Sequence, residues 1–222
     1  MSPELDGRLI VGGEWTDGDG TFVVMDPYRS TPVAEVHSAS AATVERAVAK
    51  AREGAREMGA MPAHARADLL RRAAMLVSER AEEIATTVSR QTGKALRDTR
   101  REASRSTHTL RAAATAAETL AGSLEPADAI PGGEGLLAMV MREPLGVIGA
   151  IAPFNAPFNL SMHKVAAAIA AGNSVVLKPS SHAPLSGFQL AEILLEAGLP
   201  PAAISVLPGS GVGPALVAHA GV

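Results

Sequence analysis

The chain has 222 residues, of which 47% are hydrophobic, with a formal net charge of −3 and no cysteine. This length allows one or two domains with a buried core. The lack of cysteine excludes a disulfide framework, a thiolate metal site and a cysteine nucleophile within the chain, and the slightly acidic balance argues against nucleic-acid binding. No apolar run reaches the ~18 residues of a membrane span, and Glu4 and Asp6 do not fit a signal peptide. We therefore expect a soluble, cytoplasmic protein that binds neither nucleic acid nor membrane.

The first 40 residues predict short strands. Residues 8–15 form one arm of a hairpin in which Gly12 and Gly13 take the turn, and residues 21–25 are expected to pair with it. Residues 33–36 predict a third strand.

Three helices should follow, because apolar residues recur at helical spacing. The first spans residues 41–57 behind Ser40 as N-cap, and the second spans residues 62–92 and ends at Gly93. The third, over residues 95–120, carries many arginines, which are most simply a solvated or ion-paired face.

The remaining sequence alternates between short apolar runs and helical patterns. A loop is expected over residues 122–135 and a strand over 136–142. The later strands are expected at 147–152, 174–177 and 204–207, and the helices at 160–171, 185–197 and 214–220. Strands that alternate with helices predict an α/β fold with a Rossmann-like parallel sheet and flanking helices. Three such pairs make half of a doubly wound fold, so we expect a truncated chain whose third strand has an open edge.

Two polar residues follow strands of this sheet, at the edge where ligands bind in open parallel sheets. Asn155 lies between Pro153 and Pro157; it is either a turn residue or an amide that donates to a developing oxyanion. Lys178 either extends its ammonium group into solvent or donates to ribose hydroxyls or a phosphate.

Other candidates carry weaker signals. Ser181 is a neutral hydroxyl where many dinucleotide sites have a carboxylate, which would repel a 2′-phosphate. Gly209, Gly211 and Gly213 form an incomplete phosphate-loop pattern that a plain turn explains about as well. His163, with Lys164, could lie near the site, although a lone helical histidine more often has a structural role. Neither a metal-ligand spacing nor a Ser-His-Asp set is visible.

Several segments together resemble the NAD(P)-dependent aldehyde dehydrogenase family over essentially the whole chain. The match consists of segments in the family's order: Gln91-Thr92-Gly93-Lys94, Pro144 to Gly149, Ile151 to Pro157, Ala170 to Ser180, Glu196 to Pro201 and Val206 to Gly209. Ala167 departs from the family, which usually has proline there. Each motif alone is weak, but the ordered set is specific.

The resemblance implies roles for individual residues. Asn155 would be the oxyanion-hole asparagine, Lys178 would bind the adenosine ribose, and Ser181 would occupy the position of a glutamate that favours NAD. The remaining cofactor-binding residues implied are Ile151, Ala152, Pro153, Phe154, Gly209 and Gly213. The expected cofactor is NAD or NADP, with NADP tolerated because of Ser181, and the expected substrate is a small aldehyde.

The resemblance also implies an organisation. Residues 1–121 would form the N-terminal hairpin and the helical part of the cofactor-binding domain, residues 122–143 an oligomerisation hairpin, and residues 144–222 a βαβαβα half of the dinucleotide-binding domain. Family members form homodimers or homotetramers. The family's catalytic cysteine and general-base glutamate would lie beyond Val222, so the chain is expected to be inactive alone.

Two alternatives stay open: a non-catalytic nucleotide-binding or oligomerising module of the same fold, and a relative of the acyl-phosphate reductases. For the substrate, the sequence of residues 158–164 resembles that of family members that act on small hydroxy-, carboxy- or phosphono-aldehydes. Arg105, or another arginine of the third predicted helix, is a candidate to meet an anionic tail.

Overall fold

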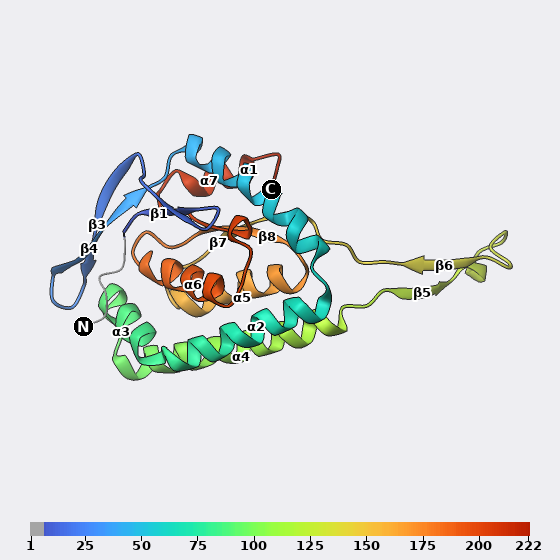
Figure 1. The fold of residues 1–222 in the computed structure, drawn as a ribbon, viewed down its shortest axis with the longest axis horizontal. Helices are drawn as coiled ribbons and strands as arrows, with labels where there is room; N and C mark the ends of the chain where they lie inside the picture. Colours follow the sequence, from blue (N-terminus) through green and yellow to red (C-terminus); the bar gives the residue numbers. More distant parts are fainter. Residues whose placement is uncertain (1–6) are drawn as a thin grey trace.

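A five-stranded mixed sheet forms the centre of the protein in the computed structural model, which describes residues 7–222 (Figure 1). Glu4 and Asp6, which argued against a signal peptide, lie outside the described residues. The strands run in the order β2-β1-β9-β8-β7. Their bounds are β1 (Leu9–Val11), β2 (Glu14–Thr16), β7 (Val147–Ile151), β8 (Ser174–Lys178) and β9 (Ile204–Val206).

The three strands predicted to be parallel pair as expected. β8 lies in the middle, parallel to β7 on one side and to β9 on the other. Every residue of β8 except Lys178 is buried, in keeping with its continuous apolar run, whereas β7 ends in the exposed Ile151. The predicted α/β fold is confirmed.

The N-terminal hairpin differs from the prediction. β1 pairs with β2 across Gly12 and Gly13, whose φ angles are 58° and 79°, and residues 21–25 belong to a separate hairpin. That hairpin consists of β3 (Gly20–Asp26) and β4 (Thr31–Ser38). The two-residue glycine turn explains the difference, since it brings the strands directly beside it into register.

The expected open edge of the third parallel strand is also wrong. β1 pairs antiparallel with β9, with Ile10 opposite Val206. The partner comes from almost the other end of the described chain, so no local pattern could indicate it.

Seven α-helices surround the sheet within the described range. They are α1 (Ala41–Ala60), α2 (Ala63–Glu79), α3 (Ala81–Thr92), α4 (Leu96–Thr119), α5 (Pro157–Ala170), α6 (Leu185–Glu196) and α7 (Val212–Ala218). Ser40 caps α1 by accepting a 3.3 Å hydrogen bond from the Thr43 N–H, and Gly93 ends α3 with a φ of 72°. The single helix predicted over residues 62–92 is two helices, because the backbone leaves helical geometry at Arg80 (φ −97°, ψ 17°).

The helices cover both faces of the sheet (Figure 1). Helices α1 and α7 pack on one face, where Val48 and Leu216 share a core cluster with Val176 of β8. Helices α5 and α6 cover the other face, where Ile169 and Phe188 belong to the larger core, and α2, α3 and α4 form a further layer outside them. Short 3-10 turns occur at η1 (Ala127–Ala129) and η2 (Pro201–Ala203).

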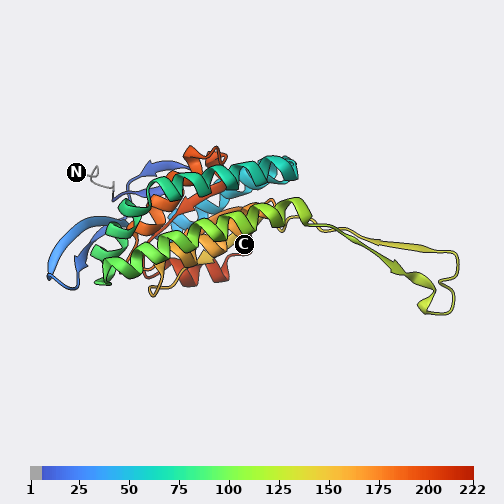
Figure 2. The same cartoon turned by 90° about the horizontal axis from the view of Figure 1, so that it is seen from below.

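A two-stranded arm projects from this body (Figure 2). It consists of β5 (Ser123–Pro126) and β6 (Leu137–Val140), which pair antiparallel, so β5 lies within the segment expected to be a loop. The arm exposes many apolar side chains: Leu124, Ile130, Leu136, Leu137, Met139, Val140 and Met141. No described helix has the length and apolar character needed to cross a membrane.

Candidate functional site

The carboxyl ends of the parallel strands meet at one edge of the sheet. Ile151 lies opposite Lys178, and the Ala152 N–H donates a 2.9 Å hydrogen bond to the Lys178 carbonyl oxygen. On the other side of β8, the Leu207 N–H donates to the carbonyl oxygen of Leu177 at 2.8 Å. The segments that follow the three strands therefore begin side by side, which is where the sequence predicted a site.

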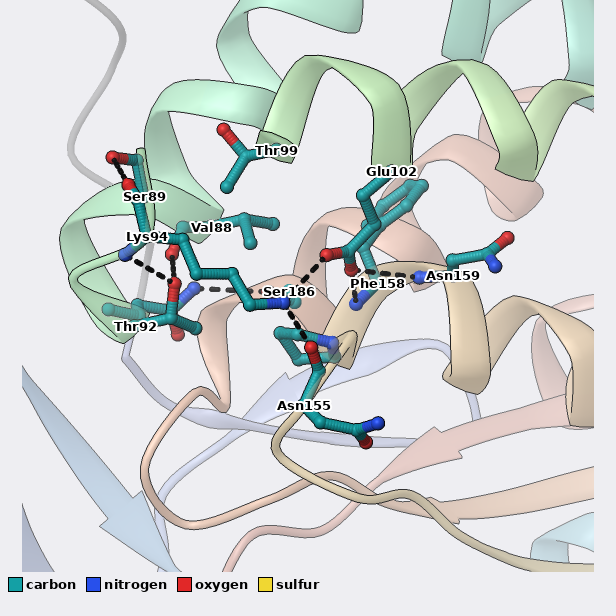
Figure 3. Close-up of polar contacts among 12 residues, drawn as sticks. Val88, Ser89, Thr92, Lys94, Thr99, Glu102, Asn155, Phe158, Asn159 and Ser186 are labelled. Atoms are coloured by element: carbon teal, nitrogen blue, oxygen red, sulfur yellow. Dashed lines mark hydrogen bonds and ion pairs between the residues drawn. The ribbon is translucent and has the colours of Figure 1, made fainter. Parts of the chain in front are cut away.

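Asn155 is exposed in the turn between β7 and α5. Its backbone carbonyl oxygen accepts a hydrogen bond from the Lys94 ammonium group. Its side chain points away from Lys94 and Glu102 (Figure 3). Among residues 7–222, the hydrogen bond found for Asn155 is the one through its backbone oxygen, and no partner is found for the side-chain amide. The amide is thus available to an external acceptor.

The residues before Asn155 differ in exposure. Ala152 is buried, whereas Ile151 is 41% and Phe154 40% exposed, and Pro153 is exposed as well. The Phe154 ring meets the His182 ring edge-on, with the centroids 5.6 Å apart. This contact links the turn after β7 to the turn after β8.

Lys178 is half-buried at the end of β8, and burial lowers the pKa of its ammonium group below the ordinary lysine value. Ser181 lies three residues further on, in a turn closed by a 3.1 Å hydrogen bond from the Ala183 N–H to the Ser180 carbonyl oxygen. β8 therefore ends in a cationic donor, Lys178, and the hydroxyl of Ser181 in the turn after it contributes no negative charge.

The two glycines after β9 have different surroundings. Gly209 is buried with a φ of 140°, and a side chain there would meet the backbone of Ala39 at 3.1–3.3 Å. Gly213 lies in the first turn of α7, and a Cβ atom added there would have no neighbour within 4 Å. Gly209 thus has a structural reason to be glycine, whereas Gly213 has none from packing.

Sequence reasoning missed Glu102 of α4, whose side chain is 1% exposed. Its Oε1 atom accepts hydrogen bonds from the N–H groups of Phe158 (2.9 Å) and Asn159 (3.2 Å) at the start of α5, and its Oε2 atom lies 3.5 Å from Lys94 Nζ (Figure 3). The one signal in the sequence was a glutamate beside Ala103 on the apolar stripe of a predicted helix.

A hollow of about 350 Å³ lies between α4 and α5. Its lining is mostly alanine, with Thr109 and His163 as polar members, and the Thr109 hydroxyl lies 3.3 Å from His163 Nε2. His163 therefore has a protein partner, and Lys164 is exposed beside it.

The arginines of α4 fall into two groups. Arg97, Arg100 and Arg101 pair with acidic residues, which confirms the expected ion-paired face for them. Arg105 is exposed, and no ion pair to it is found within the described part of the chain. No group of three or more potential metal ligands occurs among the described side chains.

Comparison with known proteins decides the family. The model of the aldehyde dehydrogenase family matches residues 15–222. The chain belongs to the aldehyde dehydrogenase family. A curated relative, 3-sulfolactaldehyde dehydrogenase of Priestia aryabhattai, is 38% identical over 203 residues, which are 91% of this chain and 42% of that protein.

Solved structures of aldehyde dehydrogenases share the fold. The NADP-dependent glyceraldehyde-3-phosphate dehydrogenase of Bacillus halodurans, in complex with NADP, superposes with a TM-score of 0.93 at 33% identity over 98% of this chain and 47% of its own. PnpE of a Pseudomonas species, in complex with NAD, gives 0.91 at 34% identity over 97% and 44%. The chain thus spans less than half the length of each of these three proteins.

Proposed function

We propose that this chain forms part of an enzyme that oxidises an aldehyde to a carboxylic acid with NAD or NADP, and that Asn155 donates a hydrogen bond to the oxyanion formed at the aldehyde carbon. The observation that carries the proposal is the exposed side-chain amide of Asn155 at the ends of the parallel strands. The backbone carbonyl oxygen of the same residue accepts a hydrogen bond from Lys94. A preorganised donor of this kind stabilises charge that develops in the transition state.

The residues at the strand tips fit a dinucleotide. Lys178 offers ammonium donors for ribose hydroxyls, and Ile151, Ala152, Pro153 and Phe154 offer a largely apolar border beside it. The cofactor, when bound, accepts a hydride from the substrate carbon. Gly209 and Gly213 would lie near the adenine. Ser181 carries no charge that would repel a 2′-phosphate, so NADP should be accepted at least comparably to NAD.

The nucleophile is not among these 222 residues, which include no cysteine. From the resemblance to the family, we expect the catalytic cysteine and the general-base glutamate in the part of the relatives that this chain does not span. The proposed contribution of the chain is therefore the oxyanion donor and part of the cofactor site.

For the substrate we favour a small aldehyde with an anionic tail. Arg105 is exposed on α4, one turn from Thr109 at the hollow between α4 and α5. The names of two relatives, a 3-sulfolactaldehyde and a glyceraldehyde-3-phosphate dehydrogenase, also specify anionic aldehydes. Guanidinium groups bind such anions through paired, charge-assisted hydrogen bonds.

The projecting arm, with residues 122–143, is proposed as the oligomerisation segment of a homodimer or homotetramer. Its exposed apolar side chains on β5 and β6 would be covered by a second copy. A second candidate function is a non-catalytic nucleotide-binding or oligomerising module. One observation favours it, namely that these 222 residues include no cysteine.

The decisive experiment measures aldehyde oxidation by the complete gene product that contains residues 1–222. Asn155→Ala should lower kcat by about 10²–10³-fold while cofactor affinity is unchanged. Cofactor binding without turnover with any aldehyde would support the non-catalytic module instead, and an unchanged kcat in Asn155→Ala would reject the role of the amide.

A further inference from the structure

The start of α5 is capped by a residue from another helix. The N-cap position of α5 is Ala156, whose side chain cannot accept a hydrogen bond, and no side-chain cap is formed there. Glu102 takes this place: its Oε1 atom accepts from the N–H groups of Phe158 and Asn159, 56 and 57 residues further along the chain. A carboxylate is favoured at a helix N-terminus because the unpaired N–H groups there carry partial positive charge.

Lys94 holds the other side of the same turn. Its ammonium group donates to the carbonyl oxygen of Asn155 and lies 3.5 Å from Glu102 Oε2 (Figure 3). The turn from Asn155 to Asn159 is therefore bound at its carbonyl end by a cation and at its N–H end by an anion, and the two charges contact each other.

The backbone of Lys94 is itself fixed at the corner between α3 and α4. Its carbonyl oxygen accepts a 2.7 Å hydrogen bond from the Ser89 hydroxyl, and the preceding Gly93 has the left-handed conformation that ends α3. Because Glu102 is buried on α4, both charged groups project from a rigid helical corner toward the turn. Charged groups held in this way keep their orientation better than groups on exposed loops.

We propose that Lys94 and Glu102 are positioning residues for catalysis: together they orient the backbone of Asn155 so that its amide points to the substrate oxygen. This inference rests on the proposed function of Asn155. The carbonyl oxygen and the side chain of Asn155 leave the same residue on different sides, so a cation that holds the carbonyl sets the direction of the amide. An ordinary structural pair would instead stabilise the fold without any special effect on turnover.

The test is a double-mutant cycle in the complete gene product. Lys94→Met keeps the aliphatic packing and removes the donor to the Asn155 carbonyl. It should lower kcat by about 10- to 100-fold with little change in KM, because small misplacements of a catalytic group cost this much. In the Asn155→Ala background the same change should lower kcat by less than about threefold, because the two residues act as one unit.

Two further variants accompany the cycle. Lys50→Met removes a lysine from the exposed surface of α1 and should leave kcat unchanged. Glu102→Gln keeps an acceptor for Phe158 and Asn159 but cannot attract the Lys94 ammonium group. Glu102→Gln should therefore still fold. Like Lys94→Met, it should lower kcat in the protein that has Asn155 and have little effect in the Asn155→Ala background.

The outcomes separate the two proposals. Suppose that Asn155→Ala lowers kcat. The positioning role is then overturned if Lys94→Met and Glu102→Gln leave kcat unchanged, or if they lower kcat as much in the Asn155→Ala background as in the unaltered protein. In either case the role of Asn155 stands. If Asn155→Ala has no effect, the proposed function falls. The positioning role in catalysis then falls with it, whatever the exchange shows. Hydrogen exchange adds a test of the geometric premise: we expect faster exchange over residues 155–160 in Lys94→Met than in Lys50→Met, and equal exchange in the two variants overturns the positioning role.

Discussion

Gln91 and Leu185 are 94 residues apart and are joined by a 2.8 Å hydrogen bond from the Leu185 N–H to Gln91 Oε1. The Gln91 amide nitrogen also donates to the Ser186 hydroxyl at 3.1 Å. Gln91 thus caps α6 from the end of α3, just as Glu102 caps α5 from α4. The end of α3 and the beginning of α4 thus hold the first turns of α5 and α6, the helices that follow β7 and β8.

Replacing Gln91 with leucine should therefore destabilise the protein. The side chain is 2% exposed, so its loss leaves a buried N–H without a partner, and we expect the free energy of unfolding to fall by about 1–3 kcal/mol. Urea denaturation measures this. Thr86→Val, which removes an exposed hydroxyl on the same helix, should change it by less than about 0.5 kcal/mol. Equal effects of the two variants would contradict the capping role.

The two glycines after β9 should separate stability from cofactor affinity. Gly209→Ala should lower the free energy of unfolding by about 1–3 kcal/mol, because its φ of 140° and the nearby Ala39 backbone disfavour a side chain. Gly213→Ala should not lower it, since the position has open space. If Gly213 lies near the adenine, Gly213→Ala should nevertheless weaken NAD(P) binding in a titration; unchanged binding would remove it from the proposed site.

Cofactor choice should respond to charge at Ser181. Ser181→Glu should lower kcat/KM with NADP at least about tenfold relative to NAD, because a carboxylate repels the 2′-phosphate. Ser181→Gln has a similar size without the charge and should change the ratio little. Steady-state rates of the complete gene product with both cofactors check this, and a strong NAD preference of the unaltered protein would oppose the premise.

Arg105→Ala should raise KM for aldehydes with an anionic tail by about tenfold. This is the loss of affinity expected when one charge-assisted hydrogen bond to the tail is removed. KM for neutral aldehydes of the same length should stay constant. Arg111→Ala removes another exposed arginine of α4 and serves as the matched control. Equal increases for anionic and neutral aldehydes would dismiss a direct contact with the tail.

The lowered pKa of Lys178 predicts a pH dependence of stability. In the unfolded chain the pKa of the ammonium group has its ordinary value of 10.5. In the folded protein burial lowers this pKa, so the group releases its proton at a lower pH. At a pH between the folded and the unfolded pKa, the unfolded state binds more protons than the folded state. The free energy of unfolding of the unaltered protein should therefore rise with pH relative to that of Lys178→Met. Urea denaturation at several alkaline pH values up to about 10.5 tests this. Parallel curves for the two proteins would contradict the burial effect.

The sequence by itself determined most local elements and the edge of the sheet at which Asn155 and Lys178 lie. Period-2 and period-3.6 patterns are local, so the parallel strands, most helices and the caps at Ser40 and Gly93 could be predicted from neighbouring residues. Asn155 and Lys178 could be placed at one edge because parallel strands end at the same side of a sheet.

Only the tertiary structure decided the contacts between distant segments. The pairing of β1 with β9 and the capping of α5 by Glu102 depend on partners far away in sequence. A buried carboxylate looks like any helical glutamate until the N–H groups that compensate its burial are brought to it. For that reason the sequence could place Asn155 at the edge of the sheet, whereas the charged pair that holds its turn became visible only in the folded chain.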